Sequence, residues 1–463
     1  MNKGIKRYIG NREFYKRVLL ISIPIMIQNG FTTFVNLLDN IMVGRVGTEQ
    51  MSGVAISNKL IFVFEITIFG IVSGAGIFGA QFYGCGDHKG VRDTFRLKLI
   101  ICTCLSGLGI LLFGFCGTDL IRLFLHGGDG TGDLQRTLGY GYEYLLIMLI
   151  GNIPYSINCA YSSTLRETGE TVTPMKAGIV AVLVNLVLNY ALIYGHFGMP
   201  VLGVRGAAIA TVISRFVELF IVVSWTHRHS VQNRFIQGVF RHFSIPASLT
   251  KKIIIKGLPL TVNELLWATG QAVLLQCYSV RGLSVIAGIN IASTIGDVFN
   301  IVYMALGSSI AILVGQLLGA GKLKEAEDTA GKLIFFSTAC CVLVGIVLAG
   351  VSNFFPELYK TQDVVKELAK DFMLVNACCL PIQAFMHATY FTIRSGGKTV
   401  VTFLFDSCFV WCMSIPLAFF LSSHTVLGII MLYAMVQGAE LIKCVVGYIL
   451  VKKGIWIQNI VNE

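Results

Sequence analysis

The stretch Gln81-Phe-Tyr-Gly84-Cys-Gly86 occurs a second time in this sequence, as Gln316-Leu-Leu-Gly319-Ala-Gly321, at an offset of 235 residues (316 − 81). The same offset joins Pro24 to Pro259, and long apolar runs separate the repeated residues. Each copy of the stretch follows such a run, so it predicts a helix C-cap with a tight turn rather than a phosphate-binding loop, which would follow a strand. The chain therefore contains two copies of one bundle of apolar helices.

The composition places these helices in a membrane. Of the 463 residues, 55% are hydrophobic and 13% are charged, whereas about a quarter of the residues of a soluble domain are charged. A helix needs roughly 20 apolar residues to cross the hydrocarbon core. Twelve runs meet that requirement: 18–43, 54–83, 97–115, 140–165, 175–193, 203–225, 253–279, 287–318, 333–355, 372–393, 400–421 and 427–451.

The net charge of +11 reflects topology, since most Lys and Arg residues fall on one side of the twelve runs. That side holds the N-terminal tail, the second loop through Lys98, the loop residues Arg166 and Arg394, and the polar stretch 226–252. Basic loops mark the cytoplasmic side. We therefore expect both termini in the cytoplasm and no nucleic-acid partner.

The cysteines and the sequence motifs give no sign of a cofactor or of catalysis. Most of the 13 cysteines lie inside apolar runs, where free Cys behaves as a small hydrophobic residue. No CxxC or His-rich spacing predicts zinc, and no HExxH, GxSxG or DxxD pattern occurs. We expect no cofactor and no enzyme.

The repeat predicts two lobes that run in the same direction. Each copy holds six runs, an even number, so equivalent helices are parallel and the lobes are related by an axis along the membrane normal. A second echo, Arg166-Glu-Thr-Gly169-Glu-Thr171 against Arg394-Ser-Gly-Gly397-Lys-Thr399, supports this. We expect an all-α membrane protein with a first lobe over residues 1–230, a cytoplasmic loop over 231–252 and a second lobe over 253–463.

Several ordered motifs resemble those of bacterial transporters of the multidrug and toxic compound extrusion (MATE) family. They are Pro24-Ile-Met-Ile-Gln-Asn29, Asn36-Leu-Leu-Asp39-Asn-Ile-Met-Val-Gly44-Arg-Val-Gly47, the two Gln-x-x-Gly-x-Gly stretches, Asn189-Tyr-Ala-Leu-Ile-Tyr-Gly195-His-Phe-Gly-Met-Pro200 and Pro259-Leu-Thr-Val-Asn-Glu264. The resemblance covers nearly the whole chain. It implies twelve helices in two six-helix lobes around a central cleft, and export of organic, often cationic compounds in exchange for protons or sodium ions.

Carboxylates inside the apolar runs are the candidate cation-binding groups, because a charged residue at membrane depth is costly and usually functional. An antiporter needs a group that binds the driving ion and a cationic substrate in turn. Asp39 is the first candidate, because it matches the position of the family's acidic residue in the first lobe. Glu264 is the second; in the repeat it stands opposite Asn29, so the two lobes would do different jobs.

The resemblance also places polar partners around Asp39. The matching positions are Asn185 and Asn189, which are four residues apart and so share a helical face, together with Thr211. Asp39, Asn185 and Asn189 would hold a sodium ion through oxygens, whereas Asp39 alone would carry a proton. The sequence leaves both coupling ions open.

Three polar residues of the second lobe complete the set of candidates. Gln383 and His387 lie where certain relatives carry an acid, and a lone intramembrane His serves equally as a packing residue or a proton carrier. Asp406 lies in an apolar run. It would either line the cavity or accept hydrogen bonds from a neighbouring helix.

Four further charged residues predict ion pairs within single helices. Arg215 and Glu218 are three apart, as are Glu440 and Lys443, so mutual neutralisation is the simplest interpretation. Pro24 and Pro259 lie inside apolar runs and predict a bend in each helix.

One alternative function shares the two-lobed architecture: a flippase for lipid-linked precursors. Such a protein needs a cleft rich in Arg and Lys to hold pyrophosphate, and only Lys59, Arg215 and Lys443 lie away from the ends of the apolar runs. The favoured interpretation is a monomeric, cation-coupled exporter of small organic molecules in the cytoplasmic membrane of a bacterium, with the lipid bilayer as its other partner.

Overall fold

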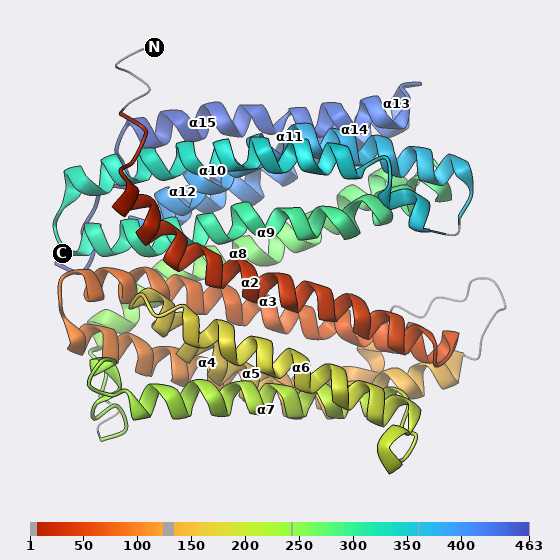
Figure 1. Cartoon of the computed structure of the whole chain (residues 1–463), viewed down its shortest axis with the longest axis horizontal. Coiled ribbons are helices and arrows are strands. Elements are labelled where there is room, and N and C mark those ends of the chain that lie inside the picture. The colour runs from red at the N-terminus through yellow and green to blue at the C-terminus, as the bar shows by residue number, and fades with distance from the viewer. Residues whose placement is uncertain (1–6, 124–133, 242–243, 360, 463) are drawn as a thin grey trace. The chain divides into compact units, whose positions relative to one another are not determined.

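The computed structural model describes residues 7–123, 134–241, 244–359 and 361–462, which form helices and connecting turns without a β-strand (Figure 1). Eleven helical segments in this part of the chain are long and apolar enough to cross a membrane. The remaining predicted run, 253–279, lies in the 33-residue helix α8. The helices are α2 (Arg12–Gly44), α3 (Thr48–Gly84), α4 (His88–Arg122), α5 (Leu134–Glu167), α6 (Val172–Tyr194), α7 (Val204–Arg228), α8 (Ala247–Ser279), α9 (Leu283–Gly319), α10 (Leu323–Val351), α11 (Asp363–Ser395), α12 (Thr399–Phe403), α13 (Ile415–His424), α14 (Ile429–Gly438) and α15 (Glu440–Lys452).

All twelve predicted apolar runs coincide with helical segments, but several helices begin well before the run that predicted them. Helix α4 begins at His88 and α10 at Leu323, about ten residues ahead of the apolar runs in both cases. Backbone hydrogen bonding continues a helix through polar residues as readily as through apolar ones. As a result, Lys98 lies inside α4 and not in a loop as the sequence predicted.

The chain forms two compact units whose boundaries cut through helices. One unit holds the residues up to 26, residues 80–87 and residues 254–463, and the other holds residues 27–79 and 88–253. The sequence prediction assigned every residue up to 230 to one lobe. In the structure the start of α2 and the end of α3 belong instead with the C-terminal half of the chain.

In the unit built mainly from the C-terminal half, α9, α10 and α11 lie side by side, and α14 and α15 pack on α11 (Figure 1). Its core is apolar, with Leu306, Leu318 and Leu333 almost fully buried. The start of α2 joins this unit through a buried hydrogen bond of 2.8 Å between the hydroxyls of Ser22 and Ser309. The short helix η3 (Phe355–Leu358) follows α10.

The two copies of the repeated stretch pack directly against each other within this unit. A Cβ added to Gly84 would lie 1.9 Å from the carbonyl oxygen of Gln316, and one added to Gly319 would lie 1.9 Å from the carbonyl oxygen of Gln81. Only glycine allows two backbones to come so close. The main chains at the ends of α3 and α9 are therefore in direct van der Waals contact.

The turns that follow these helix ends confirm the predicted C-caps. Gly86 and Gly321 have φ angles of +79° and +72°, in the left-handed region. The amide of Asp87 donates to the carbonyl of Phe82, at 2.9 Å. Together these features make the Schellman arrangement of a helix that stops at glycine.

The other unit is built from the later part of α2, most of α3, and α4 to α7. Within it, α5 packs on α4 and α7, and α6 packs on α7 (Figure 1). The turn η1 (His196–Gly198) joins α6 to α7, and η2 (Arg234–Ile236) lies in the segment that leaves α7. Glycines again bring helices close: a Cβ at Gly53 of α3 would lie 2.7 Å from the carbonyl oxygen of Thr137 in α5.

The eleventh predicted run is helical but not uniformly α-helical. Between α12 and α13 the chain forms two π-helical segments, η4 (Leu404–Cys408) and η5 (Val410–Ser414). Such bulges widen the helix and occur frequently at functional sites. The first of them contains Asp406.

Candidate functional site

Asp39 lies in a polar cluster formed by α2, α6 and α7 within one unit. The side-chain amide of Asn189 donates to a carboxylate oxygen of Asp39 at 2.5 Å and lies 3.0 Å from the side-chain oxygen of Asn185. The four-residue spacing of Asn185 and Asn189 puts both amides on one face of α6. The structure thus brings the predicted first-lobe residues together.

The amide of Asn185 links Asp39 to Thr211, and its two orientations make different hydrogen bonds. In one orientation its nitrogen lies 3.2 Å from the hydroxyl oxygen of Thr211. In the other, its nitrogen donates to both carboxylate oxygens of Asp39 at 3.1 Å, and its oxygen accepts from Thr211 at 3.2 Å. An ionised carboxylate only accepts hydrogen bonds, so the second orientation matches a charged Asp39.

The cluster holds one oxygen that has no partner. Asn185 and Asn189 are buried, at 5% and 1% exposure, and the side-chain oxygen of Asn189 accepts no hydrogen bond from the described residues. Buried polar atoms are nearly always paired. An oxygen of this kind beside a carboxylate is a potential cation ligand. No group of three or more His, Cys, Asp or Glu residues suited to a metal occurs in the described chain.

A second charged pair lies in the same unit, and it differs from the pair that the sequence predicted. The structure pairs Arg215 of α7 with Glu65 of α3, not with Glu218 three residues along its own helix. The guanidinium also lies 4.9 Å from the ring centre of Tyr155. The long Arg215 side chain crosses to neighbouring helices past Gly151, where a Cβ would come within 3.4 Å of it.

The other unit contains a cluster around Asp406. Its carboxylate accepts from the buried ammonium of Lys443 at 3.1 Å and from the amide of Asn263 at 3.1 Å. Lys443 also lies 3.6 Å from Glu440, as predicted from their spacing. Of the two alternatives left open by the sequence, the structure therefore places Asp406 as an acceptor for neighbouring helices.

Glu264 lies near this cluster without joining its hydrogen bonds. The charged groups that act on it electrostatically are Arg394 and Asp406, and within the described part of the chain it makes no hydrogen bond. Arg394 is itself buried, at 5% exposure, and not in a loop as the sequence predicted. Glu264 is therefore a carboxylate under the influence of one positive charge, Arg394, and one negative charge, Asp406.

The two remaining predicted residues, His387 and Gln383, differ in the contacts that they make. The ring of His387 packs against Tyr303 with centroids 4.7 Å apart, and its charged neighbours are Asp406 and Lys443. Gln383 is half-buried and makes no hydrogen bond or ion pair with any residue that the structure describes. The structure thus joins His387 to the second cluster and leaves Gln383 apart.

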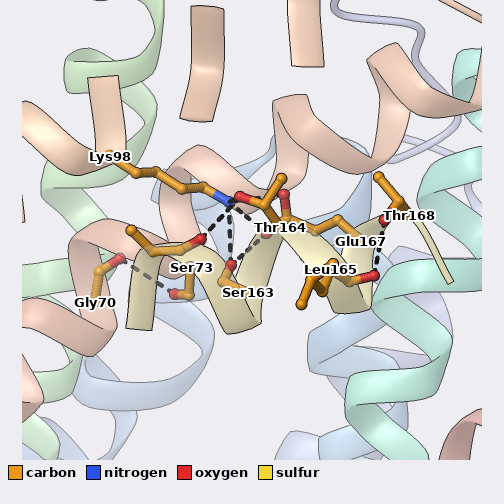
Figure 2. A network of polar contacts seen from close by, with 9 residues as sticks. Gly70, Ser73, Lys98, Ser163, Thr164, Leu165, Glu167 and Thr168 are labelled. Atoms are coloured by element: carbon orange, nitrogen blue, oxygen red, sulfur yellow. Dashed lines mark hydrogen bonds and ion pairs between the residues drawn. The ribbon is translucent and has the colours of Figure 1, made fainter. Parts of the chain in front are cut away.

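A buried ion pair between α4 and α5 was missed by the sequence analysis. Lys98 of α4, at 0% exposure, contacts both carboxylate oxygens of Glu167 in α5, at 2.6 and 2.7 Å (Figure 2). The hydroxyls of Ser163 and Thr164 lie 3.1 and 3.3 Å from the same ammonium. Because 69 residues separate the two charges, local spacing gives no signal for the pair.

Two glycines of α3 make room for this pair. A Cβ at Gly79 would lie 2.0 Å from one oxygen of Glu167, and one at Gly76 would lie 2.7 Å from the other. Beside it, Arg166 donates to the side chain of Gln28 at 2.6 Å, inside the unit and not in a cytoplasmic loop. The three-residue spacing of Gly76 and Gly79 is the local sequence signal that could have indicated space for a side chain from another helix.

Comparison with known proteins agrees with this architecture. The sequence signature of the family described as MatE matches residues 24–191 and 259–420. The chain is 24% identical to the "Probable multidrug resistance protein NorM" of Thermotoga maritima, over 90% of this chain and 88% of the relative. It is also 24% identical to the "Multidrug resistance protein PmpM" of Pseudomonas aeruginosa, over 90% and 85%.

Solved structures show the same fold. A protein described as the "Outward-facing conformation of a multidrug resistance MATE family transporter of the MOP superfamily" aligns with a TM-score of 0.86 and 20% identity, over 98% of both chains. The two-lobed fold of twelve helices is thus shared. This chain is a multi-pass membrane transporter of the MatE family.

Proposed function

We propose that this protein exports organic cations by antiport, with Asp39 as the group that exchanges the driving ion for the substrate. The curated relatives are named for multidrug resistance, which supports export of small organic molecules. The observation that carries the proposal is the environment of Asp39. Its hydrogen-bond partners among the described residues are amides and not cations, so its charge is available to a mobile cation.

A proton is the driving ion that best suits this cluster. The Asn185 amide can present its nitrogen to an ionised Asp39, or its oxygen to a protonated Asp39, whose O–H would donate to it. Protonation would thus be matched by rotation of one amide, with Thr211 reversing its role from donor to acceptor. The carboxylate would hold the organic cation when ionised and release it when protonated.

Sodium is the alternative driving ion, and the unpaired side-chain oxygen of Asn189 is the observation in its favour. The unpaired oxygen of Asn189, the Asp39 carboxylate and the oxygen of Asn185 are the hard oxygen ligands that such a cation prefers. The site contributes a single negative charge, which is enough for a monovalent ion. Both ions would compete with the substrate for the same carboxylate.

Glu264 would serve a different step. Arg394 acts on Glu264 as an opposite charge without forming an ion pair with it, so we propose that Glu264 also contacts the substrate, while Asp39 exchanges the substrate for the coupling ion. The loaded transporter would then expose its site alternately to the two sides of a bacterial cytoplasmic membrane, acting as a monomer with both termini inside. A membrane potential would assist by about 2.3 kcal/mol per net charge per 100 mV.

The experiment uses purified protein in liposomes, with ethidium as the organic cation. An imposed pH gradient and an imposed sodium gradient are applied separately, and dye movement is followed by fluorescence. We expect the pH gradient to drive export in wild type and to fail in Asp39→Asn. Asp119→Asn, which removes an exposed carboxylate, is the matched control and should behave as wild type. Full gradient-driven transport by Asp39→Asn would refute the assignment.

A further inference from the structure

A cavity of about 920 Å³ opens at the surface of one unit, between the beginning of α4 and the segment that follows η2. Its lining includes Lys89, Arg92, Asp93 and Arg96 from α4 and Gly238 and Arg241 from the facing segment. The volume falls within the range of small-molecule sites, about 300–1,000 Å³. None of these residues belongs to the Asp39 or Asp406 clusters.

The cavity carries a net positive charge. Lys89, Arg92 and Arg96 follow one another at helical spacing, so they share one face of α4. The one carboxylate among the described lining residues is that of Asp93, and it is paired with Arg96 at 3.0 Å. The described lining thus holds four cationic side chains, those of Lys89, Arg92, Arg96 and Arg241, and one carboxylate.

The wall of the cavity is fixed by hydrogen bonds to the main chain. Arg96 donates to the carbonyl of Val239 at 2.7 Å and to that of Gly238 at 2.8 Å. Arg92 donates to the carbonyl of Phe235 at 3.3 Å. The ring of Phe235 is 2% exposed and lies 5.3 Å from that of Phe95 in α4. The cations are thus positioned before any ligand arrives, which lowers the entropic cost of binding.

Beside the opening, an unpaired cation adjoins an exposed aromatic side chain. Within the described part of the chain, the guanidinium of Arg241 makes no hydrogen bond or ion pair. Its chain neighbour Phe240, which lies between the lining residues Gly238 and Arg241, is 55% exposed. An exposed apolar side chain beside basic groups is typical of a surface in contact with the headgroup region of a bilayer.

We propose that this cavity binds the phosphate headgroup of an anionic phospholipid. Basic pockets at the ends of transmembrane helices bind such headgroups, and each Lys or Arg adds to the attraction. The guanidinium groups of Arg92 and Arg241 offer N–H donors to phosphate oxygens. A lipid suits the site better than a soluble phosphate because the exposed ring of Phe240 would contact its acyl chains.

The test titrates purified, detergent-solubilised protein with dioctanoyl phosphatidylglycerol, dioctanoyl phosphatidylcholine or glycerol 3-phosphate, and measures binding by native mass spectrometry. Wild type should retain phosphatidylglycerol in preference to the other two probes. The double variant Lys89→Gln, Arg241→Gln leaves Arg92 and Arg96 intact. At a factor of about five for each charge, it should bind phosphatidylglycerol about 25-fold more weakly.

The control is Lys251→Gln, Lys252→Gln, which removes the same charge from two exposed residues of the same polar stretch outside the cavity lining. It should bind phosphatidylglycerol as wild type does. Equal losses in the two double variants would mean that only net charge matters, and the proposal would be wrong. Equal binding of phosphatidylcholine, or tight binding of glycerol 3-phosphate, would also overturn the assignment to an anionic lipid.

Discussion

Asp39 and Asp406 are both carboxylates in predominantly apolar helices, but the groups that contact them differ. Asp39 receives hydrogen bonds from amides, whereas Asp406 is paired with the buried ammonium of Lys443 at 3.1 Å. A carboxylate paired with an internal cation is already neutralised. One that is solvated by amides still requires a cation from outside. The comparison therefore supports our proposal of ion exchange at the Asp39 cluster and favours a structural role for the Asp406 cluster.

The largest expected effect separates the two aspartates by function. Asp39→Asn should reduce gradient-driven dye transport in liposomes to the level of protein-free vesicles, because no titratable group remains in its cluster. Asp406→Asn should retain gradient-driven transport, since Lys443 keeps Glu440 as a partner at 3.6 Å. Equal loss of coupling in both variants would remove the distinction between the clusters.

A third carboxylate, Glu167, extends the comparison to stability. Lys98→Ala leaves Glu167 buried without its cation and should destabilise the protein by about 3–5 kcal/mol, the usual effect of breaking a buried pair. The other half of the repeat has Leu333 and Ser395 at the matching positions. The double variant Lys98→Leu, Glu167→Ser copies that half.

Because it leaves no buried unpaired charge, this double variant should melt at a higher temperature than Lys98→Leu alone. Thermal unfolding in detergent measures both variants. A double variant less stable than Lys98→Leu alone would show that Glu167 does not depend on the lysine.

Gly79 tests how closely the pair is enclosed. Gly79→Ala would place a Cβ 2.0 Å from an oxygen of Glu167, and such overpacking typically costs about 1–3 kcal/mol. Gly114→Ala is the control, because nothing lies within 4 Å of a Cβ at Gly114 of α4. The control should be neutral or stabilising by up to about 1 kcal/mol. Similar melting temperatures for the two variants would contradict the close contact.

The smallest effects concern the hydroxyl groups that orient an amide in each cluster. Thr211 contacts the Asn185 amide at 3.2 Å, and Ser407 contacts the side-chain oxygen of Asn263 at 2.7 Å. Thr211→Val should slow transport severalfold, since Asn185 loses the partner for its rotation. Ser407→Ala should lower stability by about 1 kcal/mol and leave transport unchanged. Transport rates and melting temperatures of both variants distinguish the two roles, and the reverse pattern would contradict them.

The sequence was sufficient for the helices because hydropathy and repeat spacing are local properties. Every predicted apolar run coincides with helix, and the turns at Gly86 and Gly321 were predicted from the same short motif. The cluster of Asp39, Asn185, Asn189 and Thr211 was predicted from family resemblance and is present as a set of contacts. Its role in coupling stays a prediction.

Other features could not be read from the sequence because they depend on contacts between distant helices. Lys98, Arg166 and Arg394 were assigned to loops, since the helices extend beyond the apolar runs at one end or both. The partner of Arg215 was expected three residues away and is Glu65, which lies 150 residues earlier in the chain. A charged side chain long enough to reach a second helix has no fixed relation to local spacing.

The close contact between the ends of α3 and α9 makes substitutions in the two copies of the repeat depend on each other. The first copy supplies Gly84 and the carbonyl of Gln81, and the second copy supplies Gly319 and the carbonyl of Gln316. Each glycine could be replaced by a larger residue only if the backbone of the other copy moved. After a duplication, divergence at these positions would have to occur in both copies together. The contact between the ends of α3 and α9 therefore constrains both copies of the repeat, because a substitution in one copy requires a compensating change in the other.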